Sequence, residues 1–520
     1  MNKIKANSAR SEQPVSADST LIEKCNGVGC ALVCYAIVAI VAFCVFVVNR
    51  GDPPYLFWDE NYHVTSAERY VEGIAQFETH PPLGKMLVAL GESMSGANKN
   101  VDKHILTLDK RIDGEALPKD FSFSGMRLMP SLFAALSALL FLGLIHELLG
   151  GWLVSLLFSG LYVFENAFVV HFRATHLDSF QMFFAVGAIW HFVHLWKKPA
   201  ELKWWEYALL SIWCGLAIMV KVNGVFLLAI FPILYFKDIK ITDETTLGKL
   251  IKEFCLKAGS VVVALTLVFF VVFYVHALNG QKMPDANSAS GRKDIPFMSP
   301  EYREFLEKRR TLTPYVVYSI VRDNFHFMQV DNKGVPKLDN YKPGENGSHP
   351  LHWLFHDRNI NYRWDSANGK TAYVQLVGNQ LAWYCGTVAI ILSLILVINC
   401  RIFAVEPRGN IQTYRIIEAL TLLYLAFMAL NLWMISQRVL YLYHYFMGLM
   451  ISYVLLALMW KYLGEVHQWF NRHRLKILAI AVALFTLSYW FFLPLTNHYP
   501  MTKEQCELRN IWLSHIVDCQ

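Results

Sequence analysis

Long stretches of this chain carry no Asp, Glu, Lys or Arg, and they constrain its fold more than any other feature. A helix needs about 20 apolar residues to cross the roughly 30 Å of hydrocarbon in a bilayer. Seven runs of 18 to 25 residues meet this requirement, and each predicts a membrane-spanning helix. They are Ala31–Val48, Leu128–Ile145, Ala258–Gly280, Leu376–Cys400, Ala419–Gln437, Val439–Trp460 and Ile477–Thr496. Only 17% of the residues are charged, against about 25% in soluble domains, which excludes a soluble globular protein.

Three further segments are apolar but less regular. Trp152–Val170 is interrupted only by Glu165, and Phe180–Trp196 is slightly short but uncharged. Tyr207–Phe236 is too long for one ordinary span and is broken by 221–224, so we interpret it as two short helices; one long tilted helix is the alternative. The sequence therefore predicts an all-α polytopic membrane protein with about eleven transmembrane helices.

The distribution of Lys and Arg predicts the orientation, because cytoplasmic loops carry an excess of both. With the N-terminus inside, the inner segments are 1–30, 146–151, 197–203, 237–257, 401–415 and 461–476, and all but 146–151 hold at least three basic residues. The short outer turns carry the single residues Arg173, Lys221 and Arg438. The N-terminus is predicted inside and the C-terminus outside. The inner segments account for the net charge of +6, so no nucleic-acid partner is expected.

The helices divide the chain into five parts. These are a disordered cytoplasmic tail (1–28), an N-terminal transmembrane module (29–277) with an outer catalytic loop (50–125), an outer loop or cap (278–375), a C-terminal transmembrane module (376–496) and an outer tail (497–520). Within the first outer loop, Tyr62–Phe77 and Leu83–Met94 have the mixed character of helices lying along a membrane surface. Cys506 and Cys519 fall in the outer tail, where an oxidising compartment would allow a disulfide.

Ionisable residues in or beside spans are costly, so they are functional candidates. In this topology they all fall in the outer half of the membrane, which predicts one site: Asp59, Glu60, His80, Lys85, Arg127, Glu165, Arg173, Asp178, Lys221, Arg438 and His444. Several cations suit a phosphate whose lipid tail stays in the bilayer, and a carboxylate pair suits a general base acting on a hydroxyl. Together they indicate group transfer from a lipid phosphate to an outer acceptor.

Each residue also has a structural interpretation. The three arginines at the span ends could anchor the helices at lipid headgroups, and Lys221 could extend its ammonium group to the interface. His80-Pro-Pro82 could form a rigid turn, and His444 could be a hydrogen-bonded core histidine. The convergence of all these residues on one membrane face favours the functional interpretation. A transporter of a lipid-linked sugar would place its charges near the bilayer midplane instead.

Eight short motifs, in consistent order, resemble those of the protein O-mannosyltransferases, which are membrane-embedded lipid-phosphate-sugar glycosyltransferases. They are Phe57-Trp-Asp-Glu60, Thr79-His-Pro-Pro-Leu-Gly-Lys85, Phe164-Glu-Asn-Ala167, Phe172-Arg-Ala-Thr-His-Leu-Asp178, Val220-Lys-Val-Asn-Gly224, Ser348-His-Pro-Leu-His-Trp353, Leu376-Val-Gly-Asn379 and Arg438-Val-Leu-Tyr-Leu-Tyr-His-Tyr445. The resemblance implies transfer of mannose from a polyprenyl phosphate to Ser or Thr hydroxyls of exported proteins, with inversion.

The resemblance also implies roles for the residues. Asp59 would be the base, and Glu60 would position the site through Arg173. Donor phosphate binding would fall to Arg173, Lys221, Arg438 and Lys85, and supporting or acceptor-side roles to His80, Arg127, Glu165, Asp178, His349 and His444. No cofactor or metal is expected.

The second outer loop is too short for the β-trefoil domain of eukaryotic members, so the chain resembles a bacterial member in the inner cell membrane, with its active site on the periplasmic face. Related bacterial enzymes modify lipids such as lipid A, which leaves a lipid acceptor open.

Overall fold

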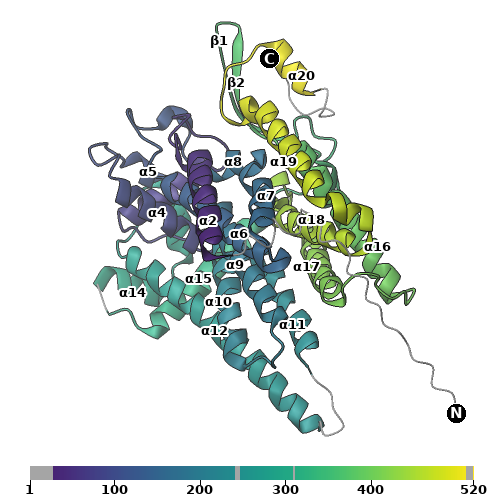
Figure 1. Cartoon of the computed structure of the whole chain (residues 1–520). Coiled ribbons are helices and arrows are strands. Elements are labelled where there is room, and N and C mark those ends of the chain that lie inside the picture. The colour runs from purple at the N-terminus through teal and green to yellow at the C-terminus, as the bar shows by residue number, and fades with distance from the viewer. Residues whose placement is uncertain (1–26, 240–245, 309–310, 511–518, 520) are drawn as a thin grey trace, which may run out of the picture.

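The computed structural model describes residues 27–239, 246–308, 311–510 and 519, and the predicted disordered tail lies almost wholly outside this range. The chain is mainly helical (Figure 1). The first half contains α2 (Val28–Ala42), η1 (Phe43–Val47), α3 (Glu60–Val71), α4 (Leu83–Ser95), α5 (Ile105–Leu108), η2 (Gly114–Ala116), α6 (Leu128–Leu149), α7 (Trp152–Val163), α8 (Asn166–Phe172), α9 (Asp178–Lys197), α10 (Trp204–Val220), η3 (Val222–Ala229), α11 (Ile230–Asp238) and α12 (Leu247–Asn279).

The second half begins with the small elements of the outer segment. These are α13 (Ala289–Asp294), η4 (Ile295–Phe297), α14 (Pro300–Lys308), α15 (Pro314–Lys333), η5 (Pro350–Phe355), β1 (Ile360–Ala367) and β2 (Lys370–Leu376). The remaining elements are α16 (Gln380–Arg401), α17 (Ile411–Ile435), η6 (Leu442–Tyr445), α18 (Phe446–Val466), α19 (Gln468–Thr496) and α20 (Lys503–Asn510).

Seven of the described helices are long and apolar enough to cross a membrane, or eight if the bent pair α7 and α8, which meet at 60°, forms one span. On α12 the exposed residues Val262, Val263 and Leu267 form the apolar surface that a lipid-facing helix presents. The chain is a multi-pass membrane protein. Each predicted apolar segment contains a helix, while the total of eleven spans and their orientation stay predictions.

The segment Tyr207–Phe236 breaks as predicted. Helix α10 ends at Val220, Lys221 adopts an extended conformation, and the tight helix η3 begins at Val222. The alternative of one long helix is therefore wrong. The break places the Lys221 side chain between two helices instead of on the outer surface of one.

The two outer segments form a cap over the helices. Helices α3 and α4 occupy the stretches predicted to lie on the membrane surface. The second segment contributes α13 to α15, and Phe77 packs between Tyr302 and Phe327, which joins the two segments in one small apolar core.

A two-stranded antiparallel hairpin, which the sequence analysis did not predict, precedes α16. Ile360 of β1 lies opposite Leu376 of β2. The predicted span beginning at Leu376 is wrong at its start, because Leu376 is the last strand residue and the Asn379 side chain caps α16 by accepting from the Ala382 amide. The apolar residues of β2 are buried against α8 and α19; only Leu376 of this strand falls in the predicted span, and the other residues of β2 fall in the predicted outer loop.

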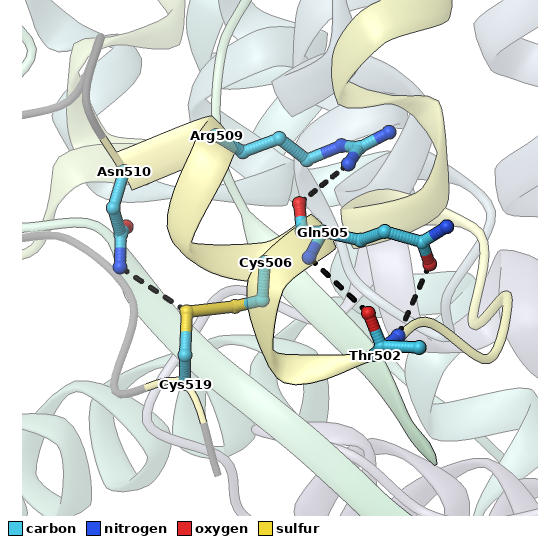
Figure 2. Close-up of a disulfide and its surroundings, with 6 residues drawn as sticks. All are labelled: Thr502, Gln505, Cys506, Arg509, Asn510 and Cys519. Atoms are coloured by element: carbon cyan, nitrogen blue, oxygen red, sulfur yellow. Dashed lines mark hydrogen bonds between the residues drawn. A yellow bond between two sulfur atoms is a disulfide. The ribbon is translucent and has the colours of Figure 1, made fainter.

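The C-terminal tail is fixed at the hairpin end of α19 (Figure 1). Thr371 of β2 and Met501 exchange backbone hydrogen bonds. Helix α20 follows, and a disulfide joins its Cys506 to Cys519, with Cα atoms 5.8 Å apart (Figure 2). The sequence left this pairing open, and the structure forms it.

Candidate active site

Asp59 lies at the N-terminus of α3, directly after a residue with unusual backbone geometry. Trp58 has a φ of +54°, a left-handed conformation that is uncommon for a bulky side chain. The turn leaves the Asp59 side chain half-buried, and it makes no capping bond to its own helix. Its Oδ2 instead accepts a hydrogen bond from the Tyr443 hydroxyl at 3.4 Å. Among the described residues, the Tyr443 hydroxyl is the donor to this carboxylate. Most hydrogen-bond acceptor positions of Asp59 therefore remain open to a ligand.

Glu60 differs from its neighbour because its carboxylate is fully buried and fully engaged. Its two oxygens accept from Arg127 Nε at 2.8 Å and Nη2 at 2.7 Å, and also from the backbone amides of Phe57 and Thr175. Arg127 in turn donates to the carbonyl oxygens of Pro53 and Tyr55, each at 2.8 Å. The pair ties the first outer loop to the start of α6.

Asp178 and Lys221 form a second buried ion pair close to Asp59. Lys221 Nζ donates to both oxygens of Asp178, at 2.8 and 2.7 Å. A carboxylate can only accept, so His171 Nε2 donates to Asp178 Oδ2 at 2.8 Å, and its Nδ1 is left to accept from the Tyr362 hydroxyl at 2.7 Å. Four elements, α8, α9, β1 and the break before η3, thus meet at one polar chain.

Aromatic rings join this chain to Asp59. The Tyr443 ring stacks on His171 with centroids 4.9 Å apart, and Lys221 Nζ lies 5.2 Å from the Tyr443 ring centre. Trp58 packs against Tyr362 at 5.3 Å. The walls around Asp59 therefore combine one cation with several aromatic faces, a composition that suits a sugar attached to an anionic group.

Three cationic side chains, one of them Lys221 of the cluster above, lie near His80. Burial, Lys221, Lys85 and Arg438 together hold the pKa of this imidazole well below its usual range, so His80 is neutral at neutral pH. Arg438 donates from Nη1 to Asn332 of α15 at 2.8 Å, and its buried Nε has no hydrogen-bond partner among the described residues. Arg438 thus keeps donor capacity for an anionic ligand.

Lys85, predicted to bind the donor phosphate, already has an ion-pair partner in the protein. It is buried on α4 and pairs closely with Glu78, a residue that Arg69 also contacts at 3.3 Å. Burial opposes ionisation of Glu78, but Lys85, Lys110 and Arg69 outweigh it and lower the pKa of Glu78 to about 2. Lys85 is close enough to act on His80, although its charge is largely compensated by Glu78.

The electrostatics favour Asp59 as a base. Burial raises the pKa of its carboxyl above the ordinary value, while Lys221 and His171 limit the rise. A carboxylate with a raised pKa accepts a proton more readily than an ordinary exposed carboxylate. Asp59, Lys221 and Asp178 therefore bring two carboxylates and one cation together in one cluster.

Comparison with known proteins identifies the family. The family model described as dolichyl-phosphate-mannose-protein mannosyltransferase matches residues 36–279. A second model, the C-terminal four-transmembrane region of protein-O-mannosyltransferase, matches residues 317–515. Together these ranges cover most of the chain. It belongs to the protein O-mannosyltransferase family.

Individual relatives are distant. Dolichyl-phosphate-mannose–protein mannosyltransferase 3 of Saccharomyces cerevisiae is 27% identical over 237 residues, which are 44% of this chain and 30% of the relative. Protein O-mannosyl-transferase 2 of Drosophila melanogaster is 23% identical over 254 residues, 46% of this chain and 32% of the relative. The matched region thus spans about a third of the length of either relative.

The fold extends further than the sequence similarity. A structure of the S. cerevisiae protein O-mannosyltransferase Pmt1-Pmt2 complex bound to the sugar donor superposes with a TM-score of 0.77, covering 96% of this chain and 95% of that chain at 15% identity. The cap, the hairpin and the broken helices therefore belong to the fold of a protein O-mannosyltransferase.

Three residues that the sequence predicts for the site make their described contacts in local structure. Arg173 does not contact Glu60; it donates to the carbonyl oxygen of Asn49 at 2.8 Å, because Arg127 occupies the Glu60 carboxylate. Glu165 caps α8 by accepting from the Ala167 amide, and it also accepts from the Asn379 amide of α16.

His349 caps η5 by accepting from the Leu351 amide, and its ring lies near His352. The predicted contact between Arg173 and Glu60 is thus wrong, whereas the predicted roles of Arg173, Glu165 and His349 at the site stay predictions.

His444 lies beside the cluster rather than in its polar chain. Its ring stacks on Tyr443 at 4.6 Å, and its Nδ1 is 3.1 Å from the Tyr441 carbonyl oxygen. His171, Tyr362 and Tyr443 belong to the cluster but were not predicted from the sequence. His171 precedes Asp178 by seven residues, but only the fold shows that α8 bends back so that both side chains meet.

Proposed function

We propose that this protein transfers a mannosyl group from a polyprenyl-phosphate donor to Ser or Thr hydroxyls of exported proteins, with inversion at the sugar. The observation that carries the proposal is Asp59, a carboxylate with a raised pKa and spare acceptor capacity, beside the buried cation Lys221. Membership of the protein O-mannosyltransferase family supports the donor and the acceptor class.

In this mechanism Asp59 accepts the proton of the acceptor hydroxyl. The hydroxyl oxygen then forms a bond to the anomeric carbon from the face opposite the phosphate, and the bond from that carbon to the phosphate oxygen breaks. The polyprenyl phosphate leaves as an anion, which Lys221 and Arg438 stabilise by charge-assisted hydrogen bonds. Phosphate is a good leaving group, so the reaction needs one carboxylate base rather than the acid and base of a glycosidase.

The site would lie at the outer face of the inner cell membrane. Two features support this location. Lys and Arg are in excess in the segments predicted to lie on the opposite side of the membrane. The Cys506–Cys519 disulfide fits an oxidising compartment for the tail. The membrane then holds the donor lipid at Lys221 while the cap faces an aqueous acceptor.

A donor and acceptor screen with purified protein tests this function. Labelled polyprenyl-phosphate mannose is offered with a Ser/Thr-rich peptide, with the same peptide carrying Ala at every Ser and Thr, or with lipid A. Label on the hydroxylated peptide alone supports the proposal. Transfer to lipid A alone would assign a lipid acceptor, and movement of intact donor across vesicles without transfer would assign a transporter.

The pH profile is expected to report Asp59. The base must be ionised, so kcat/KM should fall as pH decreases through the pKa of Asp59, at a pH above the ordinary Asp value of about 3.9. Unfolding should be separable, because Glu78, with a pKa of about 2, loses its stabilising charge only as pH falls from about 4.5 towards 2. A kcat/KM that stays constant down to pH 4 in folded protein would contradict this assignment.

Lys221→Gln is expected to raise KM for the donor by about 10- to 100-fold, since a hydrogen bond to a charged group contributes roughly 1.5–3 kcal/mol. Lys110→Gln is the matched control, because Lys110 is also a largely buried lysine paired with an aspartate, Asp294, but lies outside the proposed donor site. Both variants should lower stability, and only the first should change donor KM. Equal donor KM values in the two variants would exclude the phosphate role of Lys221.

A further inference from the structure

A cavity of about 480 Å³ opens among the helix ends far from Asp59, a volume in the range of small-ligand pockets. It lies between the α6–α7 turn, the α9–α10 loop, the end of α11, the start of α17 and the end of α18. Its polar lining comprises Lys197, Lys198, Lys237, Asp238, Asn410, Gln412, Thr413, Arg415, Lys461 and Glu465.

Two helices connect this cavity to the active site and fix the separation. Helix α9 begins at Asp178 in the site and ends at Lys197 in the cavity wall. Its 20 residues make it about 30 Å long, since a helix rises about 1.5 Å per residue. Helix α18 likewise begins next to Tyr445 and carries Lys461 near its other end. The cavity therefore lies about 30 Å from Asp178, close to one hydrocarbon thickness, which corresponds to the opposite membrane face in the predicted topology.

The cavity lining is positively charged. It holds five cationic side chains and two carboxylates. Lys461 donates to the Leu148 carbonyl oxygen at 2.8 Å, and Lys237 donates to the Lys198 carbonyl oxygen at 3.0 Å. These contacts hold both ammonium groups at the wall. Arg415 is exposed and completes the cationic rim.

The acidic groups around the cavity have partners of their own. Asp238 pairs with Lys257 at 2.9 Å and also accepts from the Leu202 amide. Glu465 accepts from the Asn410 amide at 2.9 Å and from Thr413 Oγ1 at 2.8 Å. Just outside the lining, Glu147 pairs with Lys197 and Glu206 with Lys198. The positive excess of the cavity therefore rests mainly on Arg415 and Lys461.

Helix α17 adds to this field. Its first residues, Gln412 and Thr413, line the cavity, so the helix directs its N-terminal end at the same space. The N-terminus of a 25-residue helix carries a partial positive charge and favours anions. The cations and the helix N-terminus thus act together on one cavity.

We propose that this cavity binds a phosphate group at the membrane face opposite the active site, the headgroup of an anionic membrane lipid being its main source. Phosphate suits the combination of lysine, arginine and a helix N-terminus, and basic pockets between transmembrane helices on the inner side bind lipid headgroups in this way. The site is distinct from the donor site around Lys221, because α9 separates the two by its full length.

The full-length protein in a neutral detergent is the material for the test. Dioctanoyl phosphatidic acid, dioctanoyl phosphatidylcholine and inorganic phosphate are added separately, and the Tm is measured with native mass spectrometry as a second readout. Phosphatidic acid is expected to raise Tm by roughly 2–4 °C and to remain bound in the mass spectrum, whereas phosphatidylcholine does neither. A comparable effect of inorganic phosphate would assign a free phosphate as the source.

Substitutions test whether the phosphate group binds in this cavity. Arg415→Gln with Lys461→Gln should abolish the shift, and the exposed Arg415→Gln alone should weaken it if the double variant does not fold. Lys249→Gln with Lys252→Gln, exposed residues of α12 outside the cavity, should leave the shift unchanged, as should Lys221→Gln. The proposal would be overturned if neither phosphatidic acid nor inorganic phosphate raised the Tm. It would also be overturned if the Tm shift persisted in the cavity variants, or if Lys221→Gln lost it.

Discussion

Arg127→Met should destabilise the protein by about 3–5 kcal/mol, because it leaves the fully buried Glu60 carboxylate without its ion-pair partner. The variant also removes the donors to the carbonyl oxygens of Pro53 and Tyr55, which hold the first outer loop in place. The Arg127 guanidinium also lies over the rings of Phe57 and Phe123, and methionine replaces this cation with an apolar side chain that can pack there, so the loss is mainly electrostatic. Thermal unfolding of purified protein in one detergent measures the change.

Arg111→Met is the matched control for this prediction. Arg111 lies in the same loop and also pairs with an acidic residue, Asp113, at 3.3 Å, but both side chains are exposed. Exposed pairs contribute about 0–1 kcal/mol, so the Tm of this variant should stay close to that of the wild type. If the two variants lost equal stability, the buried pair would not have the role that its burial and hydrogen bonds indicate.

Asp59→Asn is expected to lower kcat by about 10²- to 10⁴-fold, the contribution of a general base. The substitution preserves shape, and the amide oxygen of the new side chain can still accept from the Tyr443 hydroxyl, so folding and donor KM should change little. The substitution therefore mainly removes the ability of residue 59 to accept the proton of the acceptor hydroxyl. Steady-state transfer from polyprenyl-phosphate mannose to a Ser/Thr peptide provides the measurement.

The control for this variant is Asp113→Asn, which neutralises a highly exposed carboxylate in the same outer loop. Its kcat should equal that of the wild type. A kcat for Asp59→Asn within a few-fold of the wild type would remove Asp59 from the mechanism and direct attention to the other carboxylate of the cluster, Asp178.

The spans were predictable because a bilayer imposes one requirement, a long apolar helix, that composition reveals directly. The break at Lys221 was predictable for the same reason, since a charged residue followed by Asn223 and Gly224 interrupts an apolar run. The hairpin was missed, because residues of β2 such as Tyr373 and Val374 are buried and apolar, and their burial comes from tertiary contacts with α19 rather than from lipid.

The candidate site was predictable in part. Topology brings Asp59, Asp178 and Lys221 to one membrane face, and the structure joins them into one cluster. Topology does not determine which cation pairs with which carboxylate, and Arg127 rather than Arg173 contacts Glu60 because α6 begins beside the first loop. Tyr362 could not be found at all, since its contact with His171 depends on the unpredicted hairpin.

The most direct test of the central claim compares wild type and Asp59→Asn in a single-turnover reaction. Each protein is loaded with labelled polyprenyl-phosphate mannose, bound donor is quantified, and a Ser/Thr peptide is then added. The wild type should transfer the label to the peptide, whereas Asp59→Asn should bind the same amount of donor and transfer almost none. Equal transfer by both proteins, or no transfer by the wild type, would contradict the account.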